Sequence, residues 1–290
     1  MLCAYLLGCT PRVPSGLVES IAEVCPTAFI NIISNPVNSL VPMAKEILTA
    51  AGVYDPKKLT GVTTLDIVRA NTFVSQMKGT KASETYVPVI GGHSGLTILP
   101  LLSQTTPAVA FTDEEVDALS ERIRDVSGAN RPIHPSSYSL PSFLPSFPTG
   151  QGLSPPLPLP LLYPRRAIHL FIACIHVMQA GTEVVDAKDG EGSATLSTAY
   201  AGAIFAEQCL RGLAGESDIV DYAYVDEEAL GSSETNPGIP FFSRKCKFGV
   251  DGIEEVLATG PMSVYEQAAH DGMLDELKRA ADKGVEFAHA

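Results

Sequence analysis

The sequence contains no tryptophan, few basic residues and no apolar run long enough to span a membrane. Lys and Arg total 20 against 33 Asp and Glu in 290 residues, which gives a formal net charge of −13. Nucleic acids and anionic membranes bind clustered cations, so this charge balance argues against both as partners. The longest apolar run covers residues 167–178 and includes two histidines, whereas a spanning helix needs about 20 apolar residues.

The cysteines lack any pattern typical of a metal centre or a disulfide framework. All six are scattered along the chain, and none has a second cysteine or a histidine at zinc-binding spacing. A chain of this length with scattered cysteines is not a small disulfide-stapled fold. We therefore expect reduced thiols and no bound metal.

One segment has no acidic residue. Residues 126–179, called here the Pro-rich segment, hold 10 of the 22 prolines, and all 33 acids lie elsewhere. So many prolines exclude a regular helix or strand, and the composition is typical of an exposed loop, a linker or an SH3-type ligand. A further hypothesis is a translated intron, because Pro, Ser, Leu and Phe have pyrimidine-rich codons. Val126-Ser127 matches a translated splice donor, and Gln179 matches a splice acceptor.

On either side of the Pro-rich segment, helical patterns alternate with short apolar runs bounded by Pro, Asn or Gly. Such runs are typical of buried strands, and the order helix, strand, helix, strand over residues 17–63 predicts an α/β fold with a parallel sheet. The sequence predicts strands at residues 28–33, 59–63, 87–90 and 239–248. It predicts helices at residues 17–24, 39–51, 66–77, 113–124, 193–213 and 261–287.

Three short motifs carry side chains that could perform chemistry. Asp66 and Arg69 are three residues apart at the start of a predicted helix, so they share a face. Such a pair is more often a helix-cap acid with a surface ion pair. His93 lies between two glycine-containing turns, and Asn35 directly follows a predicted strand. Each signal is weak when it is taken singly.

Together these motifs closely resemble the NAD-dependent malate dehydrogenases of the lactate/malate dehydrogenase superfamily, in the mitochondrial-type and plant or algal organellar branch. The resemblance covers roughly residues 16–125 and 180–288. It is carried by residues 33–39 (ISNPVNS), 52–58 (GVYDPKK), 61–73 (GVTTLDIVRANTF), 88–93 (PVIGGH), 99–104 (LPLLSQ), 180–185 (AGTEVV) and 192–197 (GSATLS).

The resemblance implies a role for each motif residue. His93 takes the proton of the malate hydroxyl, which suits an imidazole whose unperturbed pKa is about 6.5. Asp66 orients that imidazole, and Arg69 holds a substrate carboxylate with its two-pronged guanidinium. Asn35 contacts the substrate and the nicotinamide of NAD. The remaining cofactor contacts are expected from the backbone of Ile33 and Ser34 and from Thr198, which stands where the family has methionine.

The resemblance also implies a fold and a domain division. We expect residues 16–63 to form the C-terminal part of a Rossmann domain, followed by an α+β catalytic domain at residues 64–125 and 180–290. Residues 1–15 are predicted to be an unrelated segment, and the Pro-rich segment a disordered insert. For the full-length protein, the resemblance implies a homodimer that acts on malate and oxaloacetate in an organelle.

One departure leaves an alternative open. The family binds the NAD pyrophosphate with a Gly-rich turn near its N-terminus, and this sequence has no such turn before residue 16. We therefore expect an N-terminally truncated chain with no measurable NAD binding and little or no malate dehydrogenase activity. The alternatives to an active malate dehydrogenase are a catalytically inactive truncated subunit and a defective gene model.

Overall fold

The computed structural model describes residues 3–5, 12–124 and 195–290. The Pro-rich segment and its predicted exposure lie outside these residues. The helices are α1 (Arg12–Val24), α2 (Val37–Ala50), α3 (Thr64–Lys78), α4 (Asp113–Arg124), α7 (Thr195–Leu213) and α8 (Val264–Ala288). The strands are β1 (Cys3–Tyr5), β2 (Phe29–Ile32), β3 (Leu59–Val62), β4 (Val89–Gly91), β5 (Ile98–Pro100), β6 (Ile219–Asp226), β7 (Phe241–Gly249) and β8 (Gly252–Val256).

All the strands of this part of the chain belong to one mixed sheet. Its order is β1-β2-β3-β6-β7-β4-β5, with β8 paired to β7. Strands β1, β2 and β3 are parallel, whereas β3–β6, β6–β7, β7–β4, β4–β5 and β7–β8 are antiparallel pairs. The predicted α/β class, a parallel portion followed by an α+β portion, is confirmed.

The sheet is continuous across the predicted boundary between residues 63 and 64. Strand β3 pairs with β6 through Gly61–Tyr224 and Val62–Ala223. Residues predicted to be unrelated to the fold also take part in it, because β1 pairs with β2 and α1 begins at Arg12. The domain limits therefore stay a prediction, with the two predicted units sharing one sheet.

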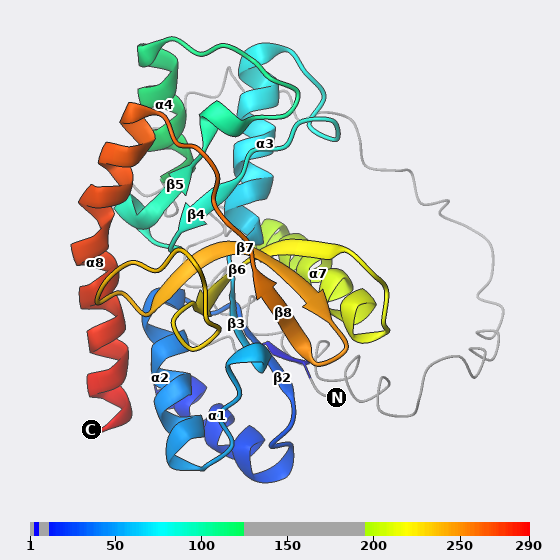
Figure 1. The fold of residues 1–290 in the computed structure, drawn as a ribbon, viewed down its shortest axis with the longest axis vertical. Helices are drawn as coiled ribbons and strands as arrows, with labels where there is room; N and C mark the ends of the chain where they lie inside the picture. The colour runs from blue at the N-terminus through cyan, green and yellow to red at the C-terminus, as the bar shows by residue number, and fades with distance from the viewer. Residues whose placement is uncertain (1–2, 6–11, 125–194) are drawn as a thin grey trace, which may run out of the picture.

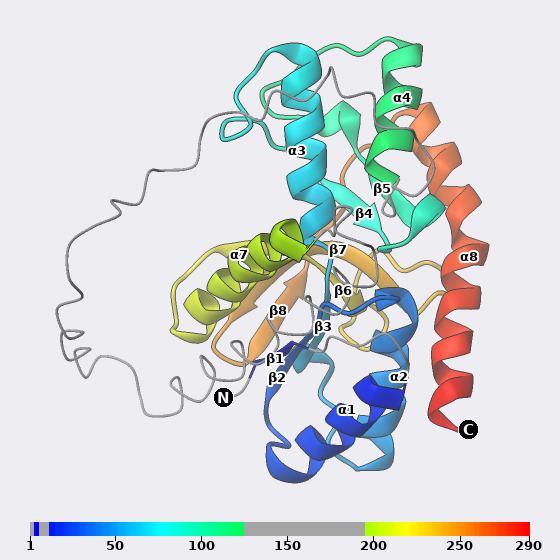
Figure 2. The same cartoon turned by 180° about the vertical axis from the view of Figure 1, so that it is seen from behind.

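Helices cover both faces of the sheet, as Figures 1 and 2 show. Helices α1, α2 and α8 lie on one face, and α7 lies on the other. The two faces alternate along β6: Tyr222 and Tyr224 belong to the core under α2 and α8, whereas Ala223 and Val225 belong to the core with Phe205 of α7. Alternation with a period of two is what a strand buried on both faces requires.

No helix among residues 12–124 and 195–290 combines the length and the apolar character of a membrane-spanning segment.

Strand β6 carries a carboxyl group whose ionisation should weaken the fold. Burial raises the pKa of Asp221 to about 6, above the value of about 3.9 expected in an unfolded chain. The folded state therefore holds this proton more tightly. Its stabilising effect is complete below about pH 4 and is lost as the pH rises through about 6.

Replacing Asp221 with asparagine should accordingly raise the free energy of unfolding at pH 8 by about 1–2 kcal/mol. Two pKa units correspond to about 2.8 kcal/mol, and partial exposure of the carboxyl reduces that figure. Asparagine can still accept the hydrogen bond that Asp221 Oδ1 receives from the backbone N–H of Tyr222, at 2.7 Å. Urea unfolding at pH 8 and pH 4 measures the effect, and equal stabilisation at both pH values would contradict it.

Candidate active site

The structure brings Asp66 and His93 into direct contact. Nδ1 of His93 lies 2.6 Å from Oδ2 of Asp66, and both side chains are buried, with 5% and 0% exposure. A carboxylate can only accept, so Nδ1–H donates, and in the neutral imidazole Nε2 then carries the lone pair. The predicted convergence of these residues, 27 positions apart in the chain, is confirmed. The pair forms an oriented imidazole whose free nitrogen can accept a proton.

Two segments that each follow a strand of the sheet supply this pair. Asp66 lies in the first turn of α3, which follows β3 immediately, and His93 follows the end of β4. Between β4 and His93 the backbone turns at Gly91, which has φ of 101°. A Cβ at Gly91 would lie 2.2 Å from the carbonyl oxygen of Thr97. Glycine therefore allows the sharp turn that aims the imidazole at α3.

The neighbouring Gly92 should be equally intolerant of a side chain. A Cβ there would lie 2.6 Å from Oγ1 of Thr97 and 2.7 Å from the side-chain amide of Asn38. We expect Gly92→Ala to lower the free energy of unfolding by about 1–3 kcal/mol, the usual effect of overpacking a buried site. Thermal unfolding measures it, with Gly16→Ala as control because no atom lies within 4 Å of a Cβ at that glycine. An unchanged melting temperature for Gly92→Ala would show that the loop around His93 can accommodate a Cβ at this position.

Arg69 lies one turn after Asp66 on the same face of α3. Its Nη1 is 3.9 Å from Oδ1 of Asp66, and its side chain is 16% exposed. Within the described residues, neither Nη1 of Arg69 nor Oδ1 of Asp66 has a hydrogen-bond partner. A buried guanidinium nitrogen without a partner is costly, so this nitrogen is available to an anionic ligand beside His93.

The segment after β2 adds further polar groups. Ser34 is buried with 2% exposure, and its Oγ lacks a partner among the described residues, whereas Asn35 is exposed and precedes Pro36. Ile33 packs against the core beneath α7. This segment reaches His93 through Asn38, whose Oδ1 accepts a hydrogen bond from the backbone N–H of His93 at 2.8 Å.

Thr198 lies near the site but makes no hydrogen bond to it in the structure. It lies half-buried in the first turn of α7, and α7 packs against α3. In both views the N-terminal end of α7 lies beside the N-terminal end of α3 (Figures 1 and 2). Thr198 therefore lies at the end of α7 that is next to the start of α3. The structure gives no hydrogen bond between Thr198 and the other predicted site residues.

Sequence reasoning missed the residues that hold the His93 loop in place. These are Asn38, Ser94 and Thr97, which are linked to one another by hydrogen bonds. Asn38 stands inside the motif of residues 33–39, three positions after Asn35. An amide-bearing residue directly before the predicted helix at residues 39–51 was the available signal.

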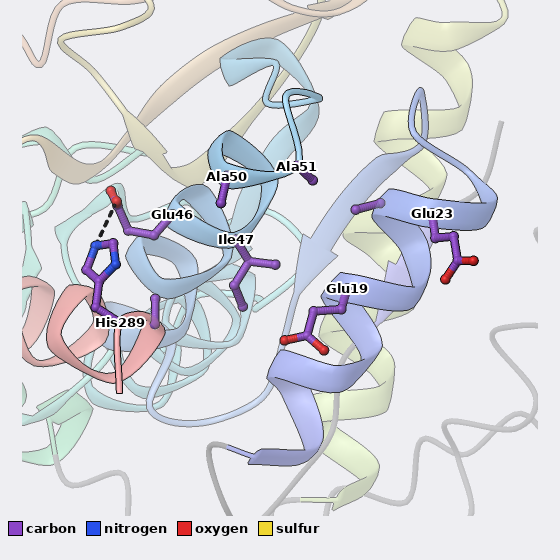
Figure 3. A pocket seen from close by; sticks show the side chains of 9 residues that line it. Glu19, Glu23, Glu46, Ile47, Ala50, Ala51 and His289 are labelled. Atoms are coloured by element: carbon purple, nitrogen blue, oxygen red, sulfur yellow. Dashed lines mark ion pairs between the residues drawn. The ribbon is translucent and has the colours of Figure 1, made fainter.

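A surface hollow lies elsewhere on the described part of the chain. Figure 3 shows it between α1, α2 and the chain's C-terminal end, with Glu19 and Glu23 on one side and Glu46 and His289 on the other. Nε2 of His289 is 3.3 Å from Oε2 of Glu46. None of the predicted site residues lines this hollow. No group of three or more His, Cys, Asp or Glu suited to a metal ion occurs in the described ranges.

Comparison with known proteins identifies related chains. A malate dehydrogenase of Vibrio cholerae is 43% identical over 98% of this chain and 71% of its own length. A chloroplastic malate dehydrogenase of Arabidopsis thaliana is 45% identical over 94% of this chain, and a mitochondrial one of Eucalyptus gunnii is 40% identical over 96%. The chain spans only 53% and 64% of these two plant relatives.

Solved structures show the same fold at low sequence identity. Malate dehydrogenase from Aeropyrum pernix has a TM-score of 0.63 with 13% identity, covering 97% of this chain and 75% of its own. Malate dehydrogenase from Plasmodium falciparum in complex with NADH has a TM-score of 0.60 with 14% identity, covering 98% and 76%.

A family model covers more than half of the chain. The model for the lactate/malate dehydrogenase alpha/beta C-terminal domain matches residues 63–129 and 163–288. Its interruption falls within the Pro-rich segment. The matched residues include Asp66, Arg69 and His93, whose contact geometry is described above. The chain therefore belongs to the lactate/malate dehydrogenase family.

Proposed function

We propose that this site performs malate dehydrogenase chemistry, the reversible NAD-dependent oxidation of malate to oxaloacetate. The observation that carries the proposal is the buried Asp66–His93 pair with Nη1 of Arg69 beside it, which makes no hydrogen bond within the described residues. A base that takes a hydroxyl proton and a cation that holds a carboxylate are what a 2-hydroxy acid requires. Relatives at 40–45% identity are named malate dehydrogenase.

The residues at the carboxyl ends of β2 and β3 fit a dinucleotide cofactor. In open α/β sheets, ligands bind outside the carboxyl ends of parallel strands, and these two parallel strands lead into Ser34 and Asp66 respectively. Oγ of Ser34 lacks a partner within the described residues, and Asn35 is exposed. We propose that Ile33, Ser34 and Asn35 contact the nicotinamide end of NAD. When bound, NAD supplies the acceptor for the hydride that leaves C2 of malate.

His93 handles the proton of the reaction. Its Nε2 accepts the proton of the malate 2-hydroxyl while the C2–H bond breaks, and the C2–O bond becomes the carbonyl of oxaloacetate. Asp66 holds the ring with Nδ1–H toward itself and stabilises the imidazolium that forms. Because the pair is buried, this charge stabilisation is stronger than it would be in water. General acid–base catalysis of this kind contributes about 10²–10⁴-fold to a rate.

Arg69 selects and orients the substrate. Its guanidinium donates to a substrate carboxylate, and its position one helical turn from Asp66 places that carboxylate beside the imidazole. Asn35, exposed at the end of β2, is proposed to contact the same substrate. A bound substrate would thus be held between the segment after β2 and the face of α3.

The assay is oxaloacetate-dependent oxidation of NADH by the purified chain, with Asp271→Asn as a surface control. Any turnover of oxaloacetate should exceed turnover of pyruvate, because the relatives are named malate dehydrogenases. If the chain is silent, joining it to the N-terminal segment of the Vibrio cholerae relative separates the alternatives. Turnover by the fusion would show that the site residues of this chain are competent for the reaction, and the absence of turnover in both proteins would refute the proposal.

The compartment is inferred from the names of relatives, and the assembly from the family resemblance. The relatives include chloroplastic, mitochondrial and glyoxysomal enzymes, and we propose an organellar location for this protein as well. We also propose a homodimer, which sedimentation equilibrium tests by giving twice the mass of the chain.

A further inference from the structure

Asn38 forms a buried junction between two parts of the site. It is the second residue of α2, has 1% exposure, and uses both ends of its side-chain amide. Oδ1 accepts from the backbone N–H of His93 at 2.8 Å. Nδ2 donates to Oγ of Ser94 at 2.9 Å and to Oγ1 of Thr97 at 3.1 Å.

The chemistry of the partners fixes the orientation of this amide. A backbone N–H can only donate, so the atom of Asn38 that faces His93 must be the oxygen. The hydroxyl of Thr97 donates to the carbonyl oxygen of Ser94 at 2.7 Å, which leaves its lone pairs for Nδ2 of Asn38. Asn38 is thus saturated by the loop that carries His93 and has no alternative arrangement of equal quality.

The surrounding packing makes this junction stiff. Gly92 lies so close that a Cβ would be 2.7 Å from the amide of Asn38. The backbone N–H of Gly92 donates to the carbonyl oxygen of Thr97 at 2.7 Å, which closes the loop around His93. On the other side, the hydroxyl of Tyr224 on β6 donates to the carbonyl oxygen of Asn38 at 3.4 Å. Movement of His93 relative to α2 would break several of these contacts together.

We propose that Asn38 is a positioning residue that sets the imidazole of His93 against the segment of residues 33–35. This inference rests on the proposed function, in which residues 33–35 contact the cofactor and substrate and His93 moves the proton. Only three positions separate Asn38 from Asn35. The side-chain amide of Asn38 therefore links the segment proposed to contact the nicotinamide to the loop that carries the proton acceptor, His93. Asn38 does not touch the reacting atoms; it acts through the backbone of His93.

The kinetic test compares Asn38→Ala with Asn31→Ala. Asn31 is another fully buried asparagine, on β2, whose Oδ1 accepts from Oγ1 of Thr60 rather than from the His93 loop. A misplacement of about 1 Å can lower a rate by about 10²-fold. We therefore expect Asn38→Ala to lower kcat by about 10–100-fold while KM for malate, set by Arg69, changes little. Asn31→Ala should leave kcat unchanged at temperatures where it is folded.

An isotope effect separates poor positioning from general instability. With malate deuterated at C2, Asn38→Ala should show a larger isotope effect on kcat than the unaltered chain, because its chemical step is slower. Two milder substitutions at Thr97 serve as a second test in case Asn38→Ala does not fold. Thr97→Val removes the hydroxyl at nearly constant volume, and Thr97→Ser retains it. We expect Thr97→Val to reproduce the loss of kcat in part and Thr97→Ser to restore it.

A measurement without turnover distinguishes failure of this inference from failure of the proposed function. Nitrogen-15 NMR of the histidine rings reports which nitrogen of His93 carries the proton. The unaltered chain and Asn31→Ala should show Nδ1–H alone, whereas Asn38→Ala and Thr97→Val should show a mixture of tautomers. A folded Asn38→Ala with an unchanged ring spectrum and unchanged kcat would overturn the inference. A tautomer change in a chain without malate turnover would retain the positioning role and refute only the proposed reaction.

Discussion

Replacing His93 with asparagine should lower kcat for malate oxidation by about 10³-fold, within the range that general acid–base catalysis contributes. Asparagine has an amide nitrogen that can still donate toward Asp66, but it has no basic atom in place of Nε2. The hydroxyl proton of malate then has no acceptor when the hydride leaves. Steady-state kinetics in the form of the protein that turns over measures the effect, and KM should change far less than kcat.

Asp66→Asn provides the companion variant for this prediction. An asparagine at position 66 can donate to Nδ1 of His93, which moves the ring proton to Nε2 and removes the lone pair that accepts from malate. His93 and Asp66 act together as one proton-accepting pair, and either substitution alone disables that pair. The double variant should therefore have a kcat no lower than that of the slower single variant. His270→Asn is a matched control, since that histidine lies on α8 beside Asp271. A His93→Asn variant that retained most of kcat would exclude His93 as the base.

Local sequence signals predicted the two strands and the helix that carry the first residues of the site. The strands at residues 29–32 and 59–62 were expected because short apolar runs end at Pro, Asn or Gly. The helix predicted at residues 66–77 begins two residues earlier in the structure, at Thr64. Spacing alone also placed Asp66 and Arg69 on one face. These features depend on neighbours in the sequence, which is why they could be predicted.

Features that depend on distant partners were missed. Strand β6 was not predicted, although it lies in the middle of the sheet between β3 and β7. Its residues carry two aspartates, and its strand character follows from pairing on both sides. Strand β8 was missed because its adjacent Glu254 and Glu255 are both exposed and break the alternation. Long-range pairing, not local propensity, decides such strands.

The same distinction applies to the site. No spacing rule joins His93 to a residue 27 positions earlier, and only the family resemblance suggested the contact that the structure shows at 2.6 Å. Asn38 was missed because its role depends on a loop 55 positions away. Residues that support a catalytic side chain through the backbone leave little trace in a single sequence.

Replacing Arg69 with lysine should lower kcat/KM for malate and oxaloacetate by about 10²-fold, chiefly through KM. Lysine keeps the positive charge but cannot donate two parallel hydrogen bonds to one carboxylate. A lost charge-assisted hydrogen bond costs about 1.5–3 kcal/mol, and about 2.8 kcal/mol corresponds to a 10²-fold change. Nη1 of Arg69, which makes no hydrogen bond to the described residues, is the donor that the substrate would use.

The matched control for this prediction is Arg279→Lys. That arginine lies on α8 with 70% exposure and pairs with Glu276 at 2.7 Å, so the same substitution there should leave both constants unchanged. Competitive inhibition by a dicarboxylate that lacks the hydroxyl, such as succinate, separates carboxylate binding from proton transfer. Its inhibition constant should rise in Arg69→Lys and stay the same in His93→Asn. An unchanged inhibition constant in Arg69→Lys would exclude Arg69 as the carboxylate-binding residue and move that role to another cation of the chain.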